Sequence, residues 1–214
     1  MTIQTAPYLD QKATWPASGR HILAQYDHAS IIVYQAYRPA IGRFAVSHQR
    51  FGGDFSYNRM SWIKPNFLWM MYCSGWGAKP GQEITLAIRL KRDFFESILA
   101  QAVPSKYDPD LYSDKEAWES SVARSSVRLQ WDPDHDPSGA RERRRAIQLG
   151  LRGAALREYG QSAIVEIIDL TEFVESQRVH VESGDYEQLI VPREQVYVPS
   201  DPIVAERLKL SING

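Results

Sequence analysis

Cysteine is almost absent from this chain, in which Cys73 is the only one. A single thiol permits no disulfide within the chain and suits a reducing compartment. No stretch approaches the roughly 18 consecutive apolar residues that a membrane span requires. Residues 1–10 also lack the basic and then apolar pattern of a signal peptide. We therefore expect a cytoplasmic protein with no membrane partner.

Several motifs of common enzyme classes are missing as well. The chain contains no phosphate loop of the Gly-x-x-x-x-Gly-Lys-Ser/Thr type, no Gly-x-Gly-x-x-Gly after a strand and no Gly-x-Ser-x-Gly elbow. Its five histidines are scattered and there is no cysteine pair, so metal-ligand spacing is absent. These absences argue against the common nucleotide-hydrolysing, dinucleotide-fold and zinc chemistries, and we predict no metal cofactor.

What the chain does contain is typical of one globular domain. Its 214 residues can bury a substantial core, and no repeat or linker divides them. We predict an N-terminal arm (1–20), a single domain (21–200) and a C-terminal tail (201–214). Four core strands are predicted, separated by helices of uneven length: Ser30–Tyr37, Glu83–Leu90, Ser125–Trp131 and Ser162–Asp169. This pattern predicts an α+β fold with one mixed, twisted sheet packed around a buried central helix.

The central helix is predicted within the richest apolar stretch, Phe55–Gly77, which holds three of the six tryptophans and three of the four methionines. Pro65 suits the first helical position and Gly75 suits the stop. The residues between them are apolar on every face, and such a helix is buried. Within this helix we expect Cys73 to be a small buried apolar residue.

The net charge of −1 conceals a segregation of charge along the chain. Six basic residues oppose Asp54 alone between residues 31 and 80, and five arginines oppose Glu142 between residues 141 and 152. Two basic segments in a near-neutral protein can surround one anionic ligand. Alternatively, basic and acidic segments pair with each other at the surface.

The first candidate site is the lead-in to the central helix. It combines cationic, amide and aromatic side chains, joined by a tryptophan beyond the helix: Tyr57, Asn58, Arg59, Trp62, Lys64 and Trp76. Arg59 offers a bidentate donor and Lys64 a point charge, and the backbone N–H groups at a helix start attract anions. The alternative is that these cations pair with acids at the edge of the core and the aromatic rings only pack.

The second candidate site follows the third predicted strand, where Gln130 and Asp132 lead into an acidic loop that ends at Gly139. A carboxylate just beyond a strand end is a common place for a catalytic acid or base. Ordinary turn chemistry explains the same Asp, Pro and Gly residues. A divalent-metal site is conceivable, but the spacing matches no calcium loop.

The third candidate site is the run Arg143–Arg145, followed by Gln148. Arginines bind the phosphates of nucleotides and nucleic acids. Arg144 and Gln148 are therefore candidate ligand-binding residues. A solvated surface explains the run equally well.

With these residues in view, the chain resembles a known family, the domain of unknown function numbered 4291. The resemblance covers most of residues 20–200 and is carried by four segments: Val33–Tyr37, Asn58–Trp76, Gln130–Pro133 and Ile147–Leu151. It implies no activity, cofactor or partner.

Two functional hypotheses follow. The first is an enzyme acting on a nucleotide-like anionic substrate, with ADP-ribosyl transfer from NAD as the specific expectation. Arg59, together with Arg38 or Lys64, would hold the pyrophosphate, and Tyr57 or Trp62 would stack on nicotinamide. Asp132 would stabilise the oxocarbenium-like state, although the late glutamate typical of ADP-ribosyltransferases cannot be aligned.

The second hypothesis is a non-catalytic module that binds a nucleotide or a nucleic acid, with the aromatic side chains as stacking platforms. Under both hypotheses the ligand is anionic. Nothing in the sequence specifies an oligomeric state.

Overall fold

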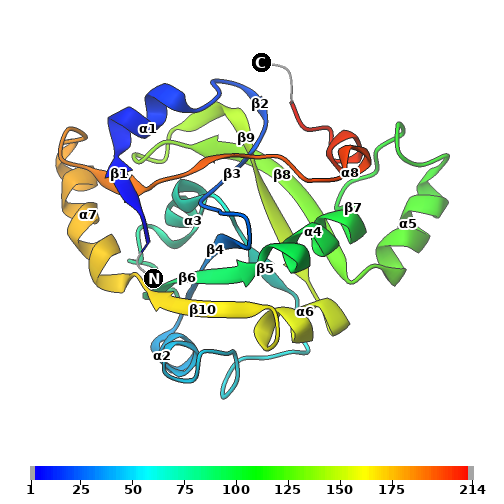
Figure 1. Ribbon diagram of the computed structural model, residues 1–214, viewed down its shortest axis with the longest axis horizontal. Helices are drawn as coiled ribbons and strands as arrows, with labels where there is room; N and C mark the ends of the chain where they lie inside the picture. The colour runs from blue at the N-terminus through cyan, green and yellow to red at the C-terminus, as the bar shows by residue number, and fades with distance from the viewer. Residues whose placement is uncertain (1–2, 212–214) are drawn as a thin grey trace.

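The computed structural model describes residues 3–211, so the ends of the predicted arm (1–2) and tail (212–214) lie outside the described residues (Figure 1). The strands are β1 (Thr5–Pro7), β2 (Gly19–Arg20), β3 (Ile22–Ala24), β4 (Ser30–Tyr37), β5 (Ser61–Ile63), β6 (Ile84–Lys91), β7 (Val103–Pro104), β8 (Val127–His135), β9 (Arg141–Leu151), β10 (Ile164–Asp169), β11 (Ile190–Pro192) and β12 (Gln195–Tyr197). The helices are α1 (Tyr8–Thr14), α2 (Pro39–His48), α3 (Phe67–Ser74), α4 (Arg92–Gln101), α5 (Lys115–Arg124), α6 (Gly153–Gly160), α7 (Thr171–Ser183) and α8 (Pro202–Arg207).

Three of the predicted core strands form one antiparallel sheet in the order β10-β6-β4. The first seven residues of β6 and the first six of β4 are buried, as their apolar and β-branched sequences require. Helix α2 packs against all three strands, whereas α3 packs against β4 and α7 against β6.

The long hairpin of β8 and β9 is the centre of a second, mixed sheet in the order β2-β9-β8-β7, with β5 also paired to β9. The predicted acidic loop from Asp132 is wrong, because β8 continues to His135 and only the tip of the hairpin is a turn. Pro133 is tolerated within the strand because the register shifts between Pro133 and His135, where the ladder is already interrupted.

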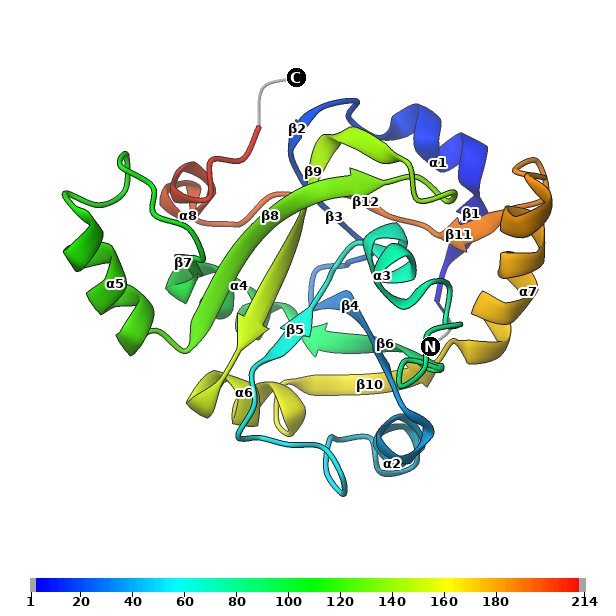
Figure 2. The ribbon, with the colours of Figure 1, turned by 180° about the vertical axis from the view of Figure 1, so that it is seen from behind.

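A single β-bridge joins the two sheets at the lead-in to the central helix. The Tyr34 N–H donates to the Lys64 carbonyl at 2.7 Å, and the Lys64 N–H donates back at 3.3 Å. Strand β5 therefore lies at the junction of the two sheets, with α3 immediately after it. Figure 2 shows α3 between the β8–β9 hairpin and the three-stranded sheet, and α3 contacts both β8 and β4.

Helix α3 is the predicted buried helix, and the α+β fold is confirmed. It ends as predicted at Gly75, whose φ of 57° is left-handed. It begins two residues later than predicted, at Phe67 and not at Pro65, and Asn66 precedes its first turn. The Asn66 side chain accepts a hydrogen bond from the Trp69 N–H at 2.6 Å, which caps the helix.

The two ends of the described chain pack onto the domain. Strand β1 pairs with β11 and β2 pairs with β9, so the first segment runs beside the hairpin (Figure 1). In α8, Val204 and Leu208 just beyond it are buried against the core. Among the described residues, no helix is both long and apolar enough to cross a membrane.

Candidate functional site

An open groove of about 500 Å³ runs along the segment that leads into α3. Its walls come from β4, β5 and α3, and among its lining residues are Gln35, Tyr37, Arg59, Met60, Ser61, Trp62, Lys64 and Cys73. A neighbouring hollow of about 510 Å³ shares Tyr37, Arg59, Met60 and Ser61 and extends to Arg38 and Asp54. The first candidate segment therefore does border a ligand-sized space.

Lys64 is the buried cation of this groove, with 7% of its surface exposed. Burial lowers the pKa of its ammonium group, and the charges of Cys73 and Asp132 act in the opposite direction. Within residues 3–211 no carboxylate oxygen lies within 4 Å of the Lys64 nitrogen. An unpaired buried cation is costly, and an anionic ligand would compensate for that cost.

Arg59 is the exposed cation at the other end of the same segment. Its guanidinium group has no hydrogen bond or ion pair with the described residues, so its donors are free for a ligand. Arg38, by contrast, bonds the Asp54 carboxylate at 2.9 Å on the rim of the neighbouring hollow. Asn58 is exposed beside Arg59.

A hydrogen-bonded network of uncharged side chains forms the floor of the groove. The Gln35 amide donates to the Ser61 hydroxyl at 2.8 Å and to the Trp62 carbonyl at 2.9 Å. Tyr37 lies 2.8 Å from the same hydroxyl, and Tyr159 donates to the Gln35 carbonyl oxygen at 2.5 Å. Sequence reasoning missed this network, although Gln35 is the only amide in an otherwise apolar strand.

Trp62 lies on the surface of β9 at Gly150, its cross-strand partner. A Cβ atom at Gly150 would come within 3.0 Å of the Trp62 ring and within 2.7 Å of the Met60 sulfur. The missing side chain at position 150 thus makes room for two groove residues.

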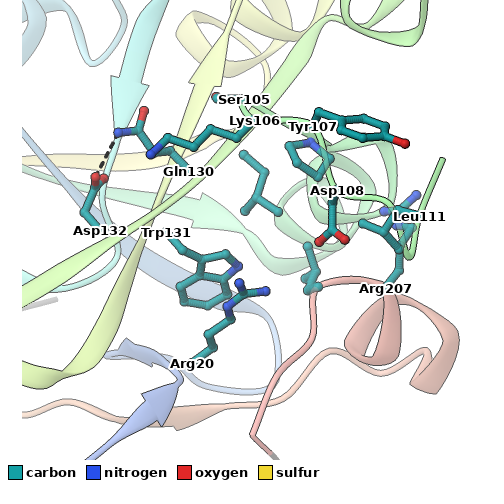
Figure 3. A pocket seen from close by; sticks show the side chains of 13 residues that line it. Arg20, Ser105, Lys106, Tyr107, Asp108, Leu111, Gln130, Trp131, Asp132 and Arg207 are labelled. Carbon is teal, nitrogen blue, oxygen red and sulfur yellow. Dashed lines mark hydrogen bonds between the residues drawn. The ribbon is translucent and has the colours of Figure 1, made fainter. Parts of the chain in front are cut away.

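Asp132 is clamped between two glutamine amides on β8 and β9. Gln130 donates to one carboxylate oxygen at 2.8 Å (Figure 3), and Gln148 donates to the other at 2.7 Å. Gln130 and Gln148 are direct cross-strand partners, which explains their common face. The carboxylate is too far from Lys64 for an ion pair, and its charge offsets only part of the lowering that burial causes in the pKa of Lys64. Asp132 lines a pocket separate from the groove that contains Lys64.

Of the nine predicted ligand-binding residues, Trp62 and Lys64 line the groove, and three of the others make contacts inside the protein instead. The Tyr57 hydroxyl donates to the Phe51 carbonyl at 2.9 Å, and Trp76 donates to the Pro137 carbonyl at 3.2 Å. The Arg144 guanidinium group lies 2.6 Å from the Asp134 carboxylate in a buried ion pair. These three side chains hold the fold together.

His135, the last residue of β8, does not line the groove either. His135 stacks on Tyr72 with ring centroids 3.6 Å apart and on Trp69 at 5.2 Å. Burial lowers its pKa. Across residues 3–211 no group of three His, Cys, Asp or Glu side chains could hold a metal ion.

Comparison with known proteins gives a family but no activity. A family model described as "Domain of unknown function (DUF4291)" matches residues 21–197 of the 214. No curated protein matches the chain.

Proposed function

The chain belongs to the DUF4291 family, whose description assigns no activity, and we propose that it is an enzyme acting on a nucleotide-like anionic substrate. The specific reaction we propose is transfer of ADP-ribose from NAD. Two cations without ion pairs, set beside a clamped carboxylate, carry this proposal.

The pyrophosphate of NAD would bind between Arg59 and Lys64. Arg59 supplies a forked donor at the exposed end, and Lys64 supplies a desolvated charge at the buried end. Lys64 gains a counter-charge from the ligand and thereby recovers the cost of its burial. A neutral ligand would not give this compensation.

The nicotinamide and its ribose would lie toward Trp62 and the polar floor. The Trp62 ring offers a stacking surface, and the Ser61 hydroxyl offers a hydrogen-bond donor and acceptor. Because Gln35 and Tyr37 already orient that hydroxyl, little conformational entropy would be lost on binding.

Asp132 would act on the charge that develops at the ribose. The bond between C1′ and the nicotinamide nitrogen breaks, and neutral nicotinamide leaves with the bonding electron pair. An acceptor oxygen forms the new bond to C1′, and any proton it carries passes to Asp132 or to water. The glutamine clamp keeps both carboxylate oxygens in place while positive charge builds up.

The direct test measures nicotinamide release and NAD-dependent thermal stabilisation of the purified protein. We expect wild type to show both. Asp132→Asn should still bind NAD but lose at least about 100-fold in release rate, since a preorganised charge contributes about that much. Asp10→Asn, a change at an exposed carboxylate on α1, serves as the matched control and should behave as wild type.

Arg59→Ala should weaken NAD binding about tenfold or more, the loss expected for a charge-assisted hydrogen bond. Absence of both turnover and NAD-dependent stabilisation in wild type would reject the proposal. NAD binding without turnover would instead favour the non-catalytic nucleotide-binding module.

A further inference from the structure

A second, smaller pocket of about 200 Å³ is lined by Asp132 and Gln130 of the clamp but not by Lys64 (Figure 3). Three basic side chains, Arg20, Lys106 and Arg207, and the indole of Trp131 line it. Figure 3 shows the Lys106 side chain extending toward Gln130 and the Arg20 guanidinium group beside Trp131. In the proposed reaction NAD itself does not occupy this pocket.

The three basic groups are not neutralised by the protein. Within residues 3–211 none of them has a carboxylate oxygen within 4 Å. Asp108 also lines the pocket, but Lys209 pairs with it at 2.7 Å. The pocket therefore presents a cationic surface to a ligand.

Three buried polar atoms around this pocket have no hydrogen-bond partner among the described residues. They are the Ser105 hydroxyl, the Trp131 indole nitrogen and the Arg207 Nε. Unsatisfied buried donors are uncommon in folded proteins. A terminal phosphate carries several acceptor oxygens. It therefore fits these three donors and three positive charges better than a single carboxylate does.

A line of exposed arginines leads out of the pocket along β9. Arg20 is the register partner of Arg145, and Arg143 is exposed two residues further along the same strand face. Arg144 points the other way, into its ion pair with Asp134. The arginine run thus places two of its charges where a longer polyanion would follow them.

We propose that this pocket binds the terminal phosphate of a nucleotide or of a nucleic-acid strand. This inference rests on the proposed function. The phosphate-bearing molecule is the acceptor of ADP-ribose and is held on the opposite side of Asp132 from NAD. The phosphate contacts Lys106, Arg20 and Trp131, and a strand continues along Arg145 and Arg143.

The test uses the full chain without NAD and three labelled probes: AMP, a short single strand with a 5′ phosphate, and the same strand without it. Fluorescence anisotropy reports binding at low salt. We expect the 5′ phosphate to improve strand binding about tenfold, in line with charge-assisted hydrogen bonds. Lys106→Ala should remove that gain and weaken AMP similarly, whereas Lys91→Ala, at an exposed lysine that ends β6, should change neither.

Trp131→Phe keeps the ring but removes the indole N–H, and it should weaken the phosphate-bearing probes by several-fold. Arg143→Ala distinguishes the two ligand sources. Weaker binding of the strand but not of AMP identifies a nucleic-acid end, and no effect on either identifies a free nucleotide.

Equal binding of the two strands, or equal effects of Lys106→Ala and Lys91→Ala, would overturn the proposal. So would stronger binding of an acidic peptide than of the phosphorylated strand. If the protein binds the phosphate but never releases nicotinamide, the phosphate pocket is supported and the proposed reaction is rejected.

Discussion

At the scale of single residues, the groove depends on the side chain that Gly150 lacks. Gly150 leaves the space in which the Trp62 ring and the Met60 side chain lie. Its backbone is paired on both sides, with Arg128 of β8 and with Trp62 of β5, so it cannot move away to make room for a larger side chain.

Gly150→Ala should therefore displace Trp62 from the wall of the groove. We expect a loss of about 1 kcal/mol in the free energy of unfolding, at the low end for overpacking, and several-fold weaker NAD binding. Urea denaturation and an NAD titration measure the two effects. An unchanged NAD affinity would show that Trp62 does not contact the ligand.

Glu194 is a second residue whose surroundings determine its chemistry. It is 2% exposed, and one of its oxygens accepts the Phe67 N–H at 2.7 Å. Burial raises the pKa of its carboxyl group well above the ordinary 4.5, and the charge of Asp134 adds to this. The folded protein therefore holds a proton on Glu194 that the unfolded chain releases at lower pH.

Stability from this group is fully present below about pH 4.5 and is lost as the pH rises toward the raised folded-state pKa. Glu194→Gln keeps the acceptor for Phe67 and cannot ionise. We expect the urea midpoint of this variant to rise relative to that of wild type as the pH increases above about 4.5. A difference that does not change with pH would contradict this assignment.

At the scale of elements, α3 depends on the cap at its first turn. Asn66 is 2% exposed, and its amide nitrogen lies 3.5 Å from the Asp134 carboxylate while its oxygen caps the helix. The helix itself is apolar on every face and has no exposed charged pairs to stabilise its start. The cap therefore fixes where β5 ends and the helix begins.

Asn66→Ala should lower the free energy of unfolding by about 2 kcal/mol, at the upper end for a lost cap because the site is buried. Asp114→Ala removes the equivalent cap of the exposed helix α5 and provides the comparison. We expect about 1 kcal/mol or less for that change. If both variants lost the same stability, burial of the Asn66 cap would contribute nothing.

At the scale of the whole molecule, Arg144 ties the first segment of the chain to the hairpin. Its guanidinium group pairs with Asp134, donates to the Pro16 carbonyl at 2.7 Å and lies over the Trp15 ring. The side chains of Arg144 and Asp134 are 8% and 1% exposed, so removing one partner leaves the other charge buried.

Arg144→Ala should cost about 3–5 kcal/mol of unfolding free energy and should speed tryptic cleavage after Lys12 and Arg20. Asp134→Asn in the same chain should restore part of the loss by removing the unpaired charge. Lys115→Ala breaks an exposed pair with Glu119 and should cost no more than about 0.5 kcal/mol. Similar losses for Arg144→Ala and Lys115→Ala would contradict this role.

The sequence alone determined the features that depend on neighbours along the chain. The buried helix ending at Gly75, the strands over residues 30–37 and 84–90, and a cationic lead-in at Arg59 and Lys64 all follow from local composition and periodicity. Pro133 within β8 is the exception, because the register shift between Pro133 and His135 that permits it depends on pairing with β9.

Only the tertiary structure decided which side chains meet. Asp132 is clamped by Gln148 because the hairpin register places them together, and Gln35 reaches Ser61 because one bridge joins the two sheets. Arg144 points inward beside two outward arginines because strand side chains alternate. Residues distant in sequence share a face or a groove through pairing geometry, which local periodicity does not encode.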